Sequence, residues 1–574
     1  MELAQQNTRP QTGSPAIIAK GATITTGASA VSVAIPDTTQ GTPPNRIRLA
    51  STAACYARLG TPSEGSAVVN AAGTGYLVND TITLTGGTYS TPMTVKVVTT
   101  QLISSVLDAI GSGYDVADTI TTSGGTASTP AEFTVATLQL ASCALNAAGT
   151  GYAAADTITL AGGTSTVKAI TTVDTSKLVS AAVNAAGTGY LTADTITAAG
   201  GTFTTAAEFT TTSTKLISAV GDVAGTGYVP ADTITAAGGT FSTAAVLTVD
   251  TTKVSATPTI FAAGTGGTPG AAVVTGTTGT GTKFQANVTI EAGGTIQSVD
   301  SIAVEGSYTV NPTNLANEPV TGGGLTGAAL VIVMGVDTFT VTTAGDYTVE
   351  SATLTQGSTS GAGTGATFNT ASYGVLTASI SDAGAYTVNT TSFTQGATSG
   401  SGTGATFNTG VFGVGTFTIT TRGNYTVGSA SFTQDSTSGA GTGATFNAGT
   451  MGVRTFTISD AGDYTVTSVT LTQAATSGAG TGATFNTSSY GVLTATVTVS
   501  GAYTVIPANP VAQGSTSGSG ASATFDVTWA TAAAAGDMLV QPGDSVMLDA
   551  VGFDQVSAIQ VTAAGVLVVS PIEN

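Results

Sequence analysis

The residues of this chain with the clearest potential for chemistry are aspartates that recur every 38 residues. Each stands four residues after a tyrosine, in an Asp-Thr-Ile sequence: Asp80, Asp118, Asp156, Asp194 and Asp232. A row of carboxylates could bind Ca²⁺, which takes about six to eight oxygen ligands. The structural alternative is an Asx turn or a strand-entry cap, since aspartate readily forms hydrogen bonds with nearby backbone groups. We favour this structural role, because a second repeat family lacks the aspartate and the calcium-binding nonapeptide Gly-Gly-x-Gly-x-Asp is missing.

Two further recurring features have a chemical and a structural interpretation. The sequence Gly-Ala-Gly-Thr-Gly-Ala at 361–366 superficially resembles a phosphate-binding loop. It lacks the required Lys, and a strand with Phe368 follows where a helix is needed, so we interpret its glycines as turn residues. The recurring tyrosines could stack on sugars. We favour their packing at the joints between repeat units, because each unit has few other aromatic residues for a core.

The composition excludes several classes of function. Histidine is absent, which removes the commonest general base and transition-metal ligand. Cys55 and Cys143 stand in unlike contexts and predict neither a disulfide nor a metal site. The formal charge of −19 argues against a nucleic-acid partner, and no apolar run predicts membrane insertion. We therefore expect no enzyme, no cofactor, and no catalytic, cofactor-binding or metal-binding residues.

The elements that must position these residues belong to two repeat families. Tyrosines mark them, with a period of 38 and then of 39 residues: Tyr76, Tyr114, Tyr152, Tyr190 and Tyr228, followed by Tyr308, Tyr347, Tyr386, Tyr425, Tyr464 and Tyr503. A fixed period of this length is typical of stacked repeat architectures. Alternating Thr, Val and Ile between paired glycines predicts three short strands per unit.

These strands can be placed by residue number. In the first family they are expected at 75–84, 94–98 and 102–110. In the second they are expected at 347–355, 366–369 and 375–381, with a Gly/Ser loop over 356–365. Phenylalanines also recur every 39 residues and complete the small core of each second-family unit: Phe368, Phe407, Phe446 and Phe485.

The sequence predicts an all-β fold: an elongated array of about twelve three-stranded repeats, inserted into a β-sandwich or jelly-roll-like anchor domain built from both termini. The halves of the anchor are 1–65 and 526–574, the latter with Trp529. The arrays are 66–255 and 308–525. The degenerate unit at 256–307, which has Gly267 in the place of the tyrosine, is where we expect the array to turn back.

Each unit has too few large side chains to offset its loss of conformational entropy alone, so it must pack against another unit or another chain. On this ground we expect a homo-oligomer, with a trimer as one arrangement. The N-terminal segment has no pattern of a secretory signal.

The pattern Gly-x-Gly-Tyr-x-x-x-Asp-Thr-Ile-Thr resembles the glycine-tyrosine repeats of structural proteins from tailed bacteriophages, fibre-like and capsid-attached ones in particular. The segments 46–60 and 568–574 resemble small phage virion proteins. The resemblance implies a non-enzymatic fibre or capsid decoration in the virion, assembled in the host cytoplasm. Its partners would be capsid or tail proteins and, at the host surface, a glycan. The alternative is a bacterial surface adhesin or matrix protein with a repeat stalk.

Overall fold

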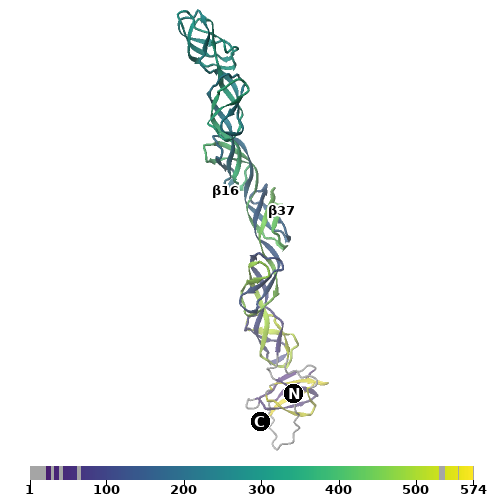
Figure 1. Ribbon diagram of the computed structural model, residues 1–574. Coiled ribbons are helices and arrows are strands. Elements are labelled where there is room, and N and C mark those ends of the chain that lie inside the picture. Colours follow the sequence, from purple (N-terminus) through teal and green to yellow (C-terminus); the bar gives the residue numbers. More distant parts are fainter. Residues whose placement is uncertain are drawn as a thin grey trace.

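The computed structural model describes residues 21–27, 31–37, 43–60, 66–528, 537–551, 553 and 555–572. These residues form a long, narrow, all-β rod, and strands from both ends of the chain lie in its base (Figure 1). The expected all-β repeat array is confirmed. In the described part of the chain, no helix is long and apolar enough to cross a membrane. Trp529 lies outside the described residues.

The base consists of two four-stranded antiparallel sheets that share one apolar core. In each sheet, every pairing joins a strand from the start of the chain to one from its end. Alternation explains the shared core: Ile47 and Leu49 point inward while Arg46 points to solvent. The strands are β1 (Ala22–Thr25), β48 (Val566–Ile572), β3 (Arg46–Ser51) and β46 (Ser545–Asp549), then β2 (Val31–Ala34), β47 (Gln555–Gln560), β4 (Cys55–Gly60) and β45 (Met538–Val540).

Between these halves the chain runs out along the rod and returns. The outgoing arm (66–254) pairs antiparallel with the returning arm (334–528) through long strands. The pairs are β8 (Thr94–Ser112) with β41 (Thr481–Val499), β11 (Glu132–Thr150) with β38 (Thr442–Asp460), β14 (Ile170–Thr188) with β35 (Thr403–Thr421), β17 (Glu208–Val223) with β32 (Thr367–Asp382), and β20 (Val246–Val254) with β29 (Met334–Thr343). The rod is therefore one long hairpin.

Each outgoing unit meets one returning unit to form a layer with its own buried tyrosine pair. From base to tip, layers 1 to 5 contain Tyr76 and Tyr503, Tyr114 and Tyr464, Tyr152 and Tyr425, Tyr190 and Tyr386, and Tyr228 and Tyr347. Short strands complete each layer. In layer 3 they are β12 (Thr157–Ala161), β13 (Thr164–Val167), β36 (Asn424–Val427) and β37 (Ser431–Thr437). Strand β16 (Thr202–Thr205) marks layer 4 in Figure 1.

The strand boundaries within a unit differ from those predicted. The expected strands 94–98 and 102–110 are parts of the single strand β8, and 366–369 and 375–381 lie largely within β32. The reason is that two long strands, one from each arm, form a ribbon that passes from one layer into the next without a turn. Part of the expected loop 356–365 is also strand, because β31 (Thr353–Thr359) pairs with the outgoing arm.

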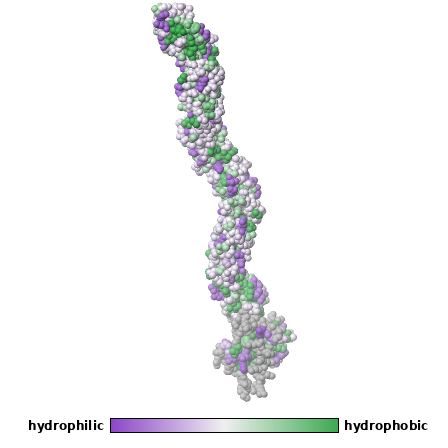
Figure 2. All heavy atoms as spheres, in the orientation of Figure 1, coloured by the Kyte–Doolittle hydropathy of each residue, from purple (hydrophilic) through white to green (hydrophobic). Residues whose placement is uncertain are grey.

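The tip of the rod reverses the chain and extends to residue 333, beyond the expected limit of 307. Its core includes Tyr308, and Leu325 fills the space next to Gly267 where other units have a tyrosine. Figure 2 shows a larger apolar patch here than along most of the visible rod surface. The sheet contains β21 (Thr259–Thr265), β28 (Thr326–Val331), β27 (Glu318–Thr321), β22 (Gly270–Gly276), β24 (Gln285–Ile290) and β25 (Ile296–Val304).

Candidate functional site

The recurring feature of the rod is a hydrogen-bonded tyrosine that joins the two arms in every layer. In layer 3, the Tyr152 hydroxyl donates to Gln434 Oε1 at 2.5 Å and accepts the N–H of Ala444 at 3.4 Å. Gln434 Nε2 donates in turn to the Gly441 carbonyl at 2.7 Å. The same tyrosine–glutamine pair recurs in the other layers: Tyr76 with Gln513, Tyr114 with Gln473, Tyr190 with Gln395, and Tyr228 with Gln356.

Tyrosines of the returning arm form hydrogen bonds with the outgoing arm in the same way. The Tyr425 hydroxyl accepts the backbone N–H of Ala169 on the outgoing arm at 2.9 Å. Equivalent bonds join Tyr347 to Ala245, Tyr386 to Ala207, Tyr464 to Ala131, and Tyr503 to Met93. Each arm thus contributes a buried tyrosine ring to the core it shares with the other arm. The tyrosine hydroxyl accepts a buried backbone N–H of that other arm, which would otherwise have no hydrogen-bond partner.

Burial of these rings excludes the sugar-stacking interpretation. Tyr152 and Tyr425 are 0% exposed, and the other layer tyrosines are at most 4% exposed. Burial raises the pKa of Tyr152; the hydrogen bond from Ala444 opposes this shift, and the charge of Asp156 adds to it. The hydroxyl is therefore a neutral structural group. No ring face is available for a sugar in solution.

The recurring aspartates cap the entry to a strand: each side chain bonds back to the N–H three residues earlier, whereas an Asx turn would bond to the N–H two residues later. Asp156 Oδ2 accepts the N–H of Ala153 at 2.9 Å, and the Asp156 N–H donates to the Ala153 carbonyl at 3.2 Å. The intervening Ala155 has a φ of 70°. The other first-family aspartates make the same Oδ2 bond. Among the described residues, no group of three or more His, Cys, Asp or Glu is placed to hold a metal ion.

The glycine-rich segments of the returning arm receive these side chains. A Cβ at Gly441 would lie 2.2 Å from the Tyr152 ring, and one at Gly439 would lie 2.4 Å from the Asp156 carboxylate. Gly443 has a φ of 78°, a conformation that favours glycine. The segment therefore allows the outgoing arm to approach closely, and it presents no phosphate-binding loop.

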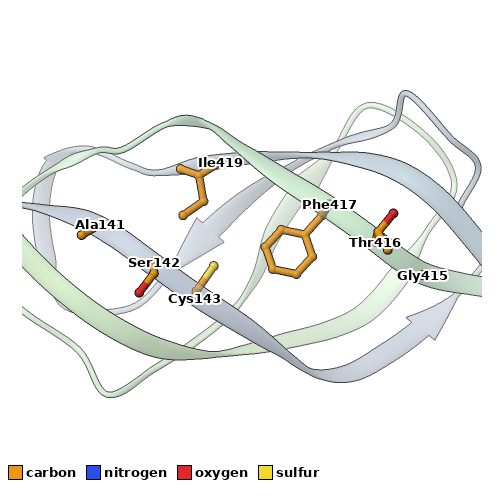
Figure 3. Close-up of a pocket in the computed structure, with 7 residues that line it drawn as sticks. All are labelled: Ala141, Ser142, Cys143, Gly415, Thr416, Phe417 and Ile419. Carbon is orange, nitrogen blue, oxygen red and sulfur yellow. The ribbon is translucent and has the colours of Figure 1, made fainter.

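Open depressions lie on the ribbons between layers. One is lined by Ser142, Cys143, Phe417 and Ile419, with Ala141, Gly415 and Thr416 around them (Figure 3). An equivalent depression one unit nearer the base contains Ser105 and Phe456. Burial raises the pKa of Cys143 to about 11, so the thiol is protonated and is a weak nucleophile at neutral pH. Cys55 is a free thiol buried in the base.

Sequence reasoning missed the glutamines that bind the tyrosines. Their signal was present, because Gln356, Gln395, Gln434 and Gln473 recur every 39 residues in a Thr-Gln dipeptide. Their role became visible only when the arms were paired, since each glutamine lies at least 128 positions from its tyrosine.

Comparisons with protein-family models, with curated proteins and with solved structures gave no match. The interpretation of function therefore depends on the geometry of the rod. In that geometry, each recurring polar side chain described above has its hydrogen bonds within the fold. The tip lies at the end of the rod farthest from the base (Figure 1).

Proposed function

We propose that this chain is a non-enzymatic virion structural protein of a tailed phage, a fibre or decoration that its base attaches to a capsid or tail. The observation that carries the proposal is the hairpin: both halves of the base are brought together, and residues 66–528 project from it as one rod with a distinct tip. Such a shape gives reach and surface coverage. Repeated units along it suit weak multivalent contact, for example with a host-surface glycan.

The pairing of arms changes the reason for expecting an oligomer. The thin core of each unit is completed by the opposite arm of the same chain, so folding of the rod does not require a second chain. A formal charge of −19 also opposes the packing of rods side by side. We infer that a homo-oligomer, including a trimer, would form through the base, with the arms separate.

The test is to image particles from the source of this chain by electron microscopy with two gold labels, one on a tag inserted at the tip and one on the base. We expect both labels on particles, with the base label at the particle surface and the tip label farther out. Recovery of the chain in the cell envelope and its absence from purified particles would favour the adhesin alternative and contradict the proposal.

A further inference from the structure

Near the tip, neighbouring layers are connected by hydrogen bonds from a polar side chain of the returning arm. We call each such contact between two layers a joint. This side chain stands three residues after the tyrosine and reaches toward the layer on the base side. Asn311 Nδ2 donates to the Tyr228 carbonyl at 2.7 Å, and Asn389 Nδ2 donates to the Tyr152 carbonyl at 2.8 Å. A hydroxyl on the outgoing arm, from Thr252 or Ser176, donates to the amide oxygen of each. Both joints are therefore closed by neutral groups.

The joint between layers 4 and 5 has a carboxylate in the same position. Glu350 Oε1 accepts the Thr192 N–H at 2.7 Å, the Thr192 hydroxyl at 2.7 Å and the Thr214 hydroxyl at 2.6 Å. Thr192 follows Tyr190 in layer 4, whereas Glu350 follows Tyr347 in layer 5. A single half-buried carboxylate oxygen thus holds the two layers together through three bonds.

The groups that donate hydrogen bonds to Glu350 from the facing arm are neutral. Tyr373 of β32 has a pKa raised to about 12, chiefly by burial, with Glu350 as a lesser cause, so its hydroxyl stays neutral. Asp194, in the turn that contains Thr192, accepts the Leu191 N–H. On β30 (Asp346–Val349), Asp346 accepts the Ser242 hydroxyl. Lys215 follows Thr214 on β17 and therefore points to the opposite face of that strand.

Acid should weaken this arrangement. Desolvation alone would raise the pKa of Glu350, but the hydrogen bonds from Thr214 and Thr192 outweigh it and lower the pKa below its ordinary value of 4.5. A lowered pKa in the folded state means that the stabilisation is complete above about pH 4.5. It is lost as the pH falls through the lowered value.

We propose that the joint between layers 4 and 5 is acid-responsive: protonation of Glu350 weakens its bonds to Thr192 and Thr214, and the tip section then bends more freely. Hydrogen bonds to a charged acceptor are about twice as strong as those to a neutral one. The Asn311 and Asn389 joints lack a titratable side chain at this position and keep their bonds. Acid thus loosens one joint of the rod.

The test is hydrogen exchange at the Thr192 amide in the full chain, corrected for the intrinsic effect of pH, at pH 7 and below the lowered pKa of Glu350. We expect protection of this amide to fall roughly fivefold in acid, the size of effect expected when hydrogen bonds to a charged acceptor become bonds to a neutral one. The Ala236 amide, which donates to Ala245 within layer 5, is the internal control and should stay protected.

Glu350→Gln keeps the shape and the acceptor but cannot titrate, so its Thr192 protection should be independent of pH. Glu350→Asn, which copies the neighbouring joints, should behave in the same way. Equal acid-induced loss in wild type and Glu350→Gln would overturn the proposal. Parallel loss at Thr192 and Ala236 in wild type would also overturn it, because acid would then be unfolding the layer. In electron micrographs, bending at this joint should widen from pH 7 to acid, whereas bending at the Asn389 joint should not change.

Discussion

At the scale of the residue, the pairing of the two arms is stabilised by side chains of each arm that form hydrogen bonds with the other. The Tyr190 hydroxyl donates to Gln395 Oε1 at 2.5 Å and accepts the Ala405 N–H at 3.4 Å. Loss of this oxygen leaves two groups of the opposite arm without their partner inside the layer. The cost of such a change is set mainly by the desolvated groups that stay unpaired.

We therefore expect Tyr190→Phe to destabilise layer 4 by about 1–3 kcal/mol. Hydrogen exchange of layer 4 amides measures this locally, which suits an array whose layers need not unfold together. The matched control is Tyr89→Phe, which removes a hydroxyl from a ring that is 39% exposed and should change stability by less than about 0.5 kcal/mol. Equal effects of the two substitutions would show that the hydroxyl of Tyr190 is not a tie between the arms.

A second residue-scale prediction concerns the turn before each recurring aspartate. Ala117, Ala155, Ala193 and Ala231 have φ values of 70–72°, whereas the first unit has Asn79 at this position. Positive φ is costly for alanine and less so for asparagine. Ala155→Asn should therefore stabilise layer 3 by about 0.5–1 kcal/mol, measured as slower exchange of its amides. Ala153→Asn in the same turn, at a position without positive φ, should give no gain; a similar gain there would contradict this reason.

At the scale of the element, the sequence predicted where strands occur and which side chains alternate along them better than it predicted the length of each strand. Alternation identified 94–98 and 102–110 as strand, but the intervening residues Thr99 to Gln101 continue β8, because they pair with β41 of the other arm. Likewise, the aspartate turn follows from local rules, whereas the tyrosine–glutamine bond does not. Contacts between residues hundreds of positions apart leave no local signal, and a single period in each arm cannot give the register between arms.

The glycine-rich bends that precede the long strands of the returning arm provide an element-scale prediction. Gly441→Ala would place a Cβ 2.2 Å from the Tyr152 ring, so the ring or the strand must shift. We expect a loss of about 1–3 kcal/mol in layer 3, seen as faster amide exchange. The control is Gly428→Ala, whose Cβ would lie 3.6 Å from Met451 and 3.8 Å from Leu138, in ordinary contact. It should be neutral or stabilising by up to about 1 kcal/mol. A tolerated Gly441→Ala would contradict the close approach of the arms.

At the scale of the whole molecule, layer number sets the length of the rod. The sequence predicted an inserted array, and the strand pairings show how its two periods are reconciled: a 38-residue outgoing unit pairs with a 39-residue returning unit, through strands whose register shifts locally. Tyr152 with Gln434 and Tyr190 with Gln395 are successive examples. A change of length must therefore be made in both arms together.

Deletion of 153–190 together with 396–434 removes one such pair of units. It joins Tyr152 to Leu191 and Gln395 to Asp435, so the new layer keeps a tyrosine opposite a glutamine, and the pairing on either side stays in register. We expect a folded protein whose rod is shorter by one layer in electron micrographs, with the base and tip unchanged.

Deletion of 153–190 alone leaves a 39-residue returning unit without an outgoing partner. Its buried Phe407 and Phe432 would be exposed, so this variant should aggregate or show a disrupted rod. The opposite outcome is that the single deletion gives the same shortened, straight rod as the deletion of both units. That result would contradict the prediction, because it would show that a layer does not require one unit from each arm.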